Sequence, residues 1–329
     1  MAHSALDVVG IGNAIVDVIA HADDAFLDAH GMIKGAMTLV DEARAEAIYD
    51  AMGPAIVSSG GSAGNTVVGI ASLGGRAGYI GKVRDDALGR EFRHDIGAAG
   101  VTYTTVASGD GPATARCLIL VTADAQRTMN TYLGACVNLT PDDIDDALIA
   151  SAQVTYLEGY LYDPPQAQAA FRKAAAVAHA AGRRVSLSLS DAFCVQRHRA
   201  AFLELIEHHV DVLFANEAET LALFETAEVS EAIAALRRIA PLAAVTRGEA
   251  GSLVVTAQET IDVACAPVAR VVDTTGAGDL YAAGFLVGLT RGETLAACGR
   301  LGSIAAAEIV SHVGARPEVP LATLVPAER

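Results

Sequence analysis

Residues 184–224 read RVSLSLSDAFCVQRHRAAFLELIEHHVDVLFANEAETLALF, and this stretch decides the fold. Two short apolar runs, at 184–189 and 211–215, are each followed by a segment of helical character, at 197–209 and 218–224. Strands that alternate with helices form βαβ units, whose strands pair in parallel. The stretch therefore predicts an α/β fold of three αβα layers, with helices on both faces of a mainly parallel central sheet.

The same alternation continues on both sides of this stretch. It predicts a strand at 154–157 and helices at 165–181, 278–289 and 294–311. Two β-rich segments, 14–40 and 104–134, do not fit the alternation. We expect them to form a small β-sheet lid over one end of a large domain that comprises residues 1–13, 41–103 and 135–329.

Composition and charge limit the classes of partner. The net charge of −16 disfavours nucleic acid and anionic membranes, because both are bound through clustered Lys and Arg. A nucleotide is not excluded, since backbone N–H groups can hold phosphate. The five cysteines are scattered and none forms a CxxC pair, which fits a reducing compartment. With no signal-peptide pattern and no apolar run long enough to span a bilayer, the sequence predicts a cytoplasmic protein.

A second stretch, Asp273-Thr-Thr-Gly-Ala-Gly-Asp279, precedes an apolar helix. Glycines at a helix start expose several N–H groups, the helix dipole adds positive charge there, and Thr274 or Thr275 is placed to cap the helix. The pattern therefore predicts an anion site. Asp279 is open to two interpretations, an ordinary helix-stabilising acid or a general base that acts on a hydroxyl beside a bound phosphoryl group.

A third stretch, Gly60-Gly-Ser-Ala-Gly-Asn65, leads into another helix and contains GxSxG, the nucleophile-elbow pattern of hydrolases. With Ser62 as nucleophile, Asp279 and His312 would follow in the chain order of that triad. The alternative is a glycine-lined wall that lets a polar ligand approach the backbone, with Asn65 bonding its hydroxyl groups. We favour the wall, because no upstream oxyanion segment accompanies the pattern.

Three further sites are each open to two interpretations. Asp17, within an apolar run, either caps a bulge or bonds ligand hydroxyls. Asn216-Glu-Ala-Glu219 ends a strand on the ligand-binding edge of the sheet, where it either caps the next helix or organises magnesium and water. Val245–Gly251 is a strand–turn–strand segment with two glycines, either part of a ligand site or merely a hairpin. Gly10-Ile-Gly12 is not a dinucleotide fingerprint, because a strand follows it, and the sequence contains no P-loop.

In combination and order, these motifs resemble the ribokinase-like (PfkB) family of carbohydrate and nucleoside kinases, over nearly the whole chain. The resemblance implies an ATP- and Mg²⁺-dependent kinase in which Asp279 is the general base and the amides of Gly276, Ala277 and Gly278 form the anion hole. It also implies substrate contacts from Asn13, Asp17, Gly61 and Asn65. It implies nucleotide contacts from Asn216, Thr246, Gly248, Gly251 and Thr275.

The resemblance extends to bound cations. Glu219 would bind Mg²⁺ through water. A monovalent cation, K⁺, would lie beside the anion hole near Asp273, Thr275, Ile309 and Gly314. Arg127, where the lid returns to the large domain, is a candidate cation over the phosphates.

The acceptor is less sharply defined. Gly12-Asn-Ala-Ile-Val-Asp17 and Asn130–Ala135 resemble adenosine kinases more than ribokinases, which implies phosphorylation of adenosine at its 5′-hydroxyl. A sugar such as ribose or fructose is the alternative. We also expect a homodimer through the exposed edge and apolar face of the lid.

Overall fold

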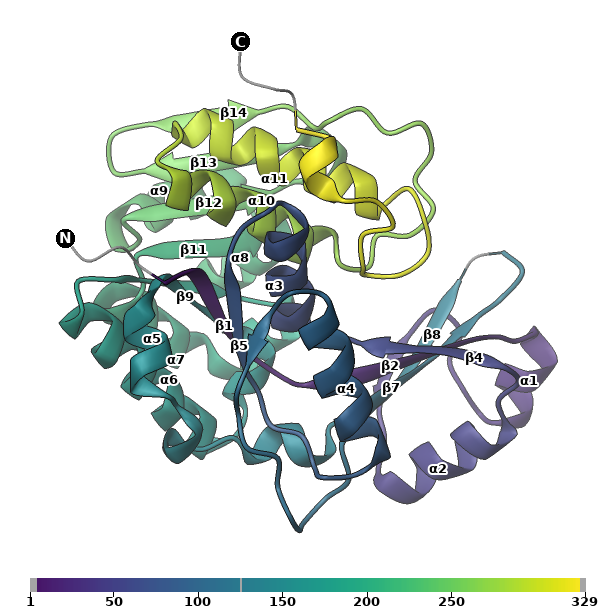
Figure 1. The fold of residues 1–329 in the computed structure, drawn as a ribbon. Coiled ribbons are helices and arrows are strands. Elements are labelled where there is room, and N and C mark those ends of the chain that lie inside the picture. Colours follow the sequence, from purple (N-terminus) through teal and green to yellow (C-terminus); the bar gives the residue numbers. More distant parts are fainter. Residues whose placement is uncertain (1–4, 125, 326–329) are drawn as a thin grey trace.

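The structure is a computed structural model that describes residues 5–124 and 126–325. Within this part of the chain the strands form two sheets, a nine-stranded and a five-stranded one (Figure 1). The large sheet has the order β14-β13-β12-β11-β10-β9-β1-β5-β6 and is parallel from β6 to β12, while β13 and β14 are antiparallel. Its strands are β1 (Leu6–Ile11), β5 (Ala77–Ile80), β6 (Thr102–Tyr103), β9 (Ala152–Glu158), β10 (Arg184–Ser188), β11 (Val212–Asn216), β12 (Leu242–Thr246), β13 (Ser252–Thr256) and β14 (Thr260–Val263).

Both faces of the large sheet are buried, so its strands carry apolar residues on both sides. Along β11, for example, Leu213 and Ala215 enter one core, whereas Val212 and Phe214 enter the other. The first core is covered by α5 (Asp146–Ser151), α6 (Pro165–Ala180), α7 (Ala192–His209), α8 (Glu217–Phe224) and α9 (Val229–Ile239). The second is covered by α3 (Ser62–Ser72), α4 (Ala87–Ala98), α10 (Ala277–Arg291) and α11 (Leu295–Ile309). The predicted three-layer α/β fold is confirmed.

The small sheet lies to one side of the large domain, together with α1 (Asp24–Ala29) and α2 (Glu42–Ala51) (Figure 1). Its order is β3-β8-β7-β2-β4, with β2 parallel to β7, β3 parallel to β8, and the other pairs antiparallel. The strands are β2 (Ile15–His21), β3 (Met37–Leu39), β4 (Ala55–Ser59), β7 (Ala115–Val121) and β8 (Arg127–Tyr132). Five short 3₁₀ turns complete the described elements, at Gly134–Asn138, Pro141–Asp143, Gly159–Tyr162, Gly248–Ala250 and Leu321–Thr323.

The division of the chain predicted from the sequence was wrong at one boundary. Residues 41–103 were assigned to the large domain, but β4 pairs with β2 in the small sheet. Helix α2 also contacts that sheet, where Tyr132 donates a hydrogen bond to Glu42 at 2.8 Å. The alternation of strands and helices gave no signal here, because β4 is a lone strand whose partner lies some forty residues earlier in the chain. The end segments 1–4 and 326–329 of that division lie outside the described residues.

Within residues 5–124 and 126–325, no helix combines the length and apolar character needed to cross a membrane.

Candidate active site

A cleft of about 1070 Å³ opens where the parallel strands of the large sheet end. Its lining includes Asn13 after β1, Glu158 at the end of β9, Ser188 on β10, Asn216 on β11 and Thr246 on β12. The carboxyl edge of a parallel sheet is the usual ligand-binding edge of such folds. The small sheet contributes the opposite wall, with Ile15, Asp17, Cys117, Ile119, Met129 and Thr131.

The start of α10 lies in this cleft. Gly276 is the residue before the helix and has a φ of 78°, in the left-handed region that glycine tolerates. A Cβ at this position would lie 2.8 Å from the Ala315 Cβ. The prediction that Thr274 or Thr275 caps the helix was wrong, because no side chain caps α10. Since the amide of Gly276 donates to no described residue, it is available to an anion.

Asp279 lies in the first turn of α10 and lines the cleft. Its carboxylate accepts hydrogen bonds from Ser62 Oγ at 2.6 Å and from Asn65 Nδ2 at 2.9 Å. Burial raises the pKa of Asp279, while these two hydrogen bonds and the charge of Arg316 oppose that rise. The arrangement holds an acceptor-only carboxylate at a fixed position beside the helix N-terminus, as a general base requires.

The hydrolase alternative was wrong. Ser62 donates directly to Asp279 with no imidazole between them, and His312 contacts Glu308 at 3.1 Å instead. None of the described residues that line the cleft is a histidine. Without a histidine to take its proton, Ser62 has no activating base of the triad kind.

We therefore expect Ser62→Ala to retain substantial catalytic activity. The substitution removes one hydrogen bond to the Asp279 carboxylate, worth about 1.5 kcal/mol at the lower end of the range for charged acceptors, so turnover should stay within about tenfold of the wild-type value. Steady-state rates at saturating substrate measure this. A complete loss of turnover in a folded Ser62→Ala protein would restore Ser62 as the nucleophile.

Two asparagines present bare carbonyl oxygens to the cleft. Asn13 Nδ2 donates to Glu158 at 2.9 Å and Asn65 Nδ2 donates to Asp279, which fixes the orientation of both amides because carboxylates only accept. The buried Oδ1 atoms of Asn13 and Asn65 have no hydrogen-bond partner among the described residues. Both residues line the cleft, so these oxygens are placed to accept hydrogen bonds from ligand hydroxyls.

Asp17 adds a third acceptor to this wall. It pairs in register with Ser58 and Cys117 in a regular ladder, so the bulge interpretation was wrong. Its carboxylate has no hydrogen bond or ion pair within the described part of the chain, and it packs against the backbone of Gly60, where any Cβ would clash with it. Burial raises the pKa of Asp17 to about 6, which nearby Arg316 and Arg127 moderate.

Gly61 lies in the same wall of the cleft, within the glycine-rich motif that was predicted to line a ligand site. It precedes α3 with a φ of 82°, and a Cβ there would clash with the carbonyl oxygen of Asn13. Only glycine therefore lets the start of α3 approach the loop after β1.

Sequence reasoning missed Glu158, which joins the loop after β1 to the start of α3. Its carboxylate accepts hydrogen bonds from the Asn13 amide, from Asn13 Nδ2 and, at 2.7 Å, from the Ala63 amide. Burial raises its pKa to about 7 against the effect of those hydrogen bonds. The available signal was an acid followed by Gly159 at the end of an apolar strand, on the ligand-binding edge of the sheet.

Arg316 was also missed. Its guanidinium donates to the carbonyl oxygens of Ser59 at 2.7 Å and Gly64 at 2.9 Å, and so joins β4 to the first turn of α3. Burial lowers its pKa, while the charges of Asp17 and other acids act in the opposite direction. This cation lies near the acids of the cleft and holds the glycine-rich motif in place.

Asn216 and Glu219 form the helix cap that was one of their two predicted roles. Asn216 Oδ1 accepts from the Glu219 amide at 2.8 Å, and the Glu219 carboxylate accepts from the Asn216 amide at 2.9 Å. Both also line the cleft beside Thr246, which pairs with Asn216 in the sheet. Water-mediated Mg²⁺ binding by Glu219 stays a prediction.

The protonation of Glu219 gives a testable pH dependence. Burial raises its pKa from 4.5 to about 7. The folded state then binds the proton more tightly than the unfolded chain, so stability is lost as the pH rises from about 4.5 to about 7, at up to about 1.4 kcal/mol per pH unit. Glu219→Gln keeps the capping pattern but does not titrate, so its urea-unfolding free energy should fall less steeply over this range.

Glu217→Gln, in the same helical turn, is the matched control for the loss of an acid. Its unfolding free energy should fall with pH as steeply as that of the wild type. Parallel pH profiles for wild type and Glu219→Gln would contradict the assignment.

The turn after β12 is the hairpin that was one of its two predicted forms. β12 and β13 pair antiparallel around the 3₁₀ turn Gly248–Ala250. Thr246 lines the cleft, whereas Gly248 and Gly251 are not among its lining residues. The predicted contacts of these two glycines with a nucleotide stay predictions.

Arg127 and Asp273 form a buried ion pair, with 2.8 Å between Arg127 Nη1 and Asp273 Oδ2. Asp273 also accepts hydrogen bonds from the amides of Thr275 and Gly314, both at 3.0 Å. Arg127 does not line the cleft, so its predicted place over the phosphates stays a prediction. Ile309 is fully buried at the end of α11.

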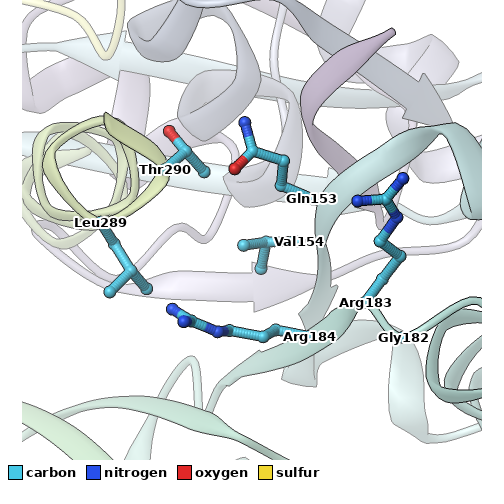
Figure 2. Close-up of a pocket in the computed structure, with 7 residues that line it drawn as sticks. All are labelled: Gln153, Val154, Gly182, Arg183, Arg184, Leu289 and Thr290. Atoms are coloured by element: carbon cyan, nitrogen blue, oxygen red, sulfur yellow. The ribbon is translucent and has the colours of Figure 1, made fainter. Parts of the chain in front are cut away.

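A smaller hollow of about 180 Å³ lies at the other edge of the large sheet, where β9 and β10 begin and α10 ends (Figure 2). Gln153, Arg183, Arg184 and Thr290 are its polar lining residues. It contains no carboxylate and is remote from the cleft, because it lies at the amino ends of strands whose carboxyl ends form the site.

The fold and the cleft define a phosphotransferase that acts on an alcohol group: a buried carboxylate lies beside a glycine-rich helix start at the ligand-binding edge of a parallel sheet. The sequence profile of the pfkB family of carbohydrate kinases matches residues 56–322, and the chain belongs to this family.

Relatives in this family include both nucleoside and sugar kinases. The crystal structure of adenosine kinase from Sinorhizobium meliloti is 55% identical, with a TM-score of 0.90 over 97% of this chain and 98% of that one. A probable sugar kinase from Rhizobium etli is 48% identical, with a TM-score of 0.91 over 97% of each chain. Adenosine kinase of Saccharomyces cerevisiae is 28% identical over 93% of this chain and 95% of its own length.

Proposed function

We propose that the protein transfers the γ-phosphoryl group of ATP to the 5′-hydroxyl of a nucleoside, with adenosine as the preferred acceptor. The carrying observation is the wall of acceptors, Asn13 Oδ1, Asn65 Oδ1 and the Asp17 carboxylate, beside Asp279. Such a wall suits a ligand that donates several hydrogen bonds, as the hydroxyls of a ribose ring do. The 55% identical adenosine kinase supports adenosine over a free sugar.

The apolar part of the cleft supports a nucleobase. Tyr160 lines the cleft directly after Glu158 and Gly159 and is 38% exposed. Phe193, 73% exposed, also lines the cleft, and Ile15, Leu39 and Leu133 add apolar surface. A free ribose or fructose would leave these rings in water, whereas a purine would cover a ring face. Sequence reasoning could not identify this surface, because Tyr160 lies between two other tyrosines, Tyr156 and Tyr162, that are buried in the core, and the sequence does not distinguish the three.

In the proposed mechanism, Asp279 accepts the proton of the acceptor hydroxyl as its oxygen bonds to the γ-phosphorus, and the bond from that phosphorus to the bridging oxygen breaks to release ADP. Ser62 and Asn65 hold the carboxylate in position. The start of α10 receives the charge that develops on the transferred group. Asn216, Glu219 and Thr246 line the cleft where the phosphates would lie. Mg²⁺ bound with ATP would supply positive charge to a cleft rich in carboxylates, with Glu219 bonding its waters.

A panel of acceptors tests the proposal. With ATP and Mg²⁺, adenosine, inosine, ribose and fructose are compared by the rate of ADP release and by kcat/KM. We expect adenosine to give the highest kcat/KM and Tyr160→Ala to raise the KM for adenosine far more than any KM for ribose. A higher kcat/KM for ribose or fructose would replace the proposal with the sugar-kinase alternative, which the 48% identical probable sugar kinase supports.

We further propose a homodimer formed through the small sheet. Ile56 on the edge strand β4 is 71% exposed, whereas Met37 and Leu39 on the opposite edge strand β3 line the cleft. Unpaired edges with exposed apolar side chains favour pairing with a second copy. Sedimentation velocity at micromolar protein should show a dimer, and Ile56→Lys should convert it to a monomer. A monomer in the wild-type protein would contradict this assembly.

A further inference from the structure

The ion pair between Arg127 and Asp273 joins the small sheet to the segment that precedes α10. Arg127 belongs to β8 of the small sheet, whereas Asp273 precedes the glycine-rich turn at α10. The two side chains are each 7% exposed, and 2.8 Å separates Arg127 Nη1 from Asp273 Oδ2. Two charges that are this buried are stable only if the charge of each partner compensates the other for the loss of its hydration. The contact therefore fixes β8 to the segment that carries the anion site.

Asp273 in turn holds that segment in shape. Its Oδ1 accepts from the Thr275 amide, and its Oδ2 accepts from the Gly314 amide. The carbonyl oxygen of Val310 accepts from the amide of Val272 at 2.7 Å, so the chain before α10 is tied to the chain after α11. Displacement of the Asp273 carboxylate would release Thr275, the residue before Gly276, and with it the position of the anion-binding amides.

A monovalent cation does not fit this arrangement. Such an ion takes oxygen ligands, and Asp273 is the charged oxygen donor that the family resemblance assigns to it. Here that carboxylate is already surrounded by one guanidinium and two N–H donors. A K⁺ ion at Asp273 would lie beside the positive charge of Arg127, and the two like charges would repel each other.

We propose that Arg127 takes the place of a monovalent cation at Asp273, so that the enzyme holds its anion site without K⁺. Arginine is suited to this role because its guanidinium is always charged and presents several N–H donors. The contact is an ion pair without an aligned hydrogen bond, since none of the three guanidinium nitrogens has such a partner among the described residues. Arg127 is then a positioning residue. The inference rests on the proposed phosphoryl transfer.

The test compares K⁺, Na⁺ and N-methylglucamine chlorides at constant ionic strength. We expect the wild-type turnover to change by less than about twofold, because charges are screened equally in all three solutions. Arg127→Ala should lose roughly 10–100-fold, as the loss of a supporting contact to a catalytic group commonly does, and K⁺ should restore part of that loss. Arg116→Ala, which removes an arginine at the opposite end of the β7–β8 pair, is the matched control and should not acquire K⁺ dependence.

A second measurement needs no turnover. The thermal midpoint of unfolding in ADP should be the same in K⁺ and Na⁺ for wild type, and higher in K⁺ for Arg127→Ala. This separates the inference from the proposed function, because a protein that phosphorylates no acceptor still reports its cation binding. If Arg127→Ala does not fold, the proposal is tested by the wild type in K⁺ and Na⁺ and by Arg127→Lys. Because Arg127→Lys keeps the positive charge, its thermal midpoint should be the same in K⁺ and Na⁺.

The proposal would be overturned if K⁺ activated the wild type several-fold, or if the thermal midpoint of the wild type were higher in K⁺ than in Na⁺. So would an Arg127→Ala variant that is folded and fully active in every salt.

Discussion

Replacement of Asp279 by asparagine is expected to reduce turnover by roughly 10²–10⁴, which is the usual contribution of a general base. Asparagine has the same shape, and its side-chain oxygen can still accept from Ser62 or Asn65. It cannot take a proton from the acceptor hydroxyl, so the chemical step should suffer while the site keeps its form. Steady-state rates of ADP release, measured at saturating ATP and acceptor, give the change in kcat.

The affinity for ATP separates a lost base from a damaged site. Asp279→Asn should bind ATP with nearly the wild-type Kd in equilibrium titrations, because the loss of a carboxylate beside the phosphates does not weaken their attraction. Near wild-type turnover in Asp279→Asn would return Asp279 to the role of an ordinary helix-stabilising acid. The raised pKa of Asp279 also predicts that kcat/KM falls as the solution is acidified through that pKa.

Gly276→Ala is expected to lower kcat by about 10²–10³, comparable to the loss of one donor from an oxyanion hole. The backbone at Gly276 is left-handed, with a φ of 78°, and a Cβ would approach Ala315 to 2.8 Å. To relieve both strains the turn must move, and the amides that would hold the transferred phosphoryl group move with it. Rapid-quench measurement of phosphoryl transfer monitors this step.

Gly292→Ala is the matched control at the other end of α10. Gly292 has a φ of 80°, but a Cβ there would meet nothing within 4 Å. Both substitutions place alanine in a left-handed conformation at a cost of about 1–2 kcal/mol, yet only Gly276 lines the cleft. Equal losses of kcat in the two variants would mean that Gly276 acts through stability alone.

The large domain could be predicted from the sequence because its signals are local. In β11 and α8, for instance, a buried strand is followed at once by a capped helix, and both features lie within thirteen residues of one another. The strand β4 defeated this approach because its assignment depends on pairing with β2 across the chain. Periodicity identifies an element, but it does not tell to which sheet a lone strand belongs.

The residues of the candidate site fall into the same two groups, those with a local sequence signal and those whose partners lie far along the chain. Gly276 and Gly61 were found because a helix that begins at glycines exposes amides, which is a property of adjacent residues. Glu158 and Arg316 were missed because their roles depend on partners far along the chain, Asn13 and Ala63 for the one and Ser59 and Gly64 for the other. The ion pair of Arg127 with Asp273 likewise joins distant parts of the chain, strand β8 and the segment before α10, so nothing in either motif indicates it.

The most direct test of the central claim is product analysis after incubation of the purified protein with Mg²⁺, adenosine and ATP labelled in its γ-phosphate. The label should appear on the 5′-oxygen of adenosine, as AMP, in wild type, and the rate should fall by roughly 10²–10⁴ in Asp279→Asn. Absence of labelled AMP from the wild-type reaction, together with transfer of the label to ribose or fructose when the sugar replaces adenosine, would contradict the account.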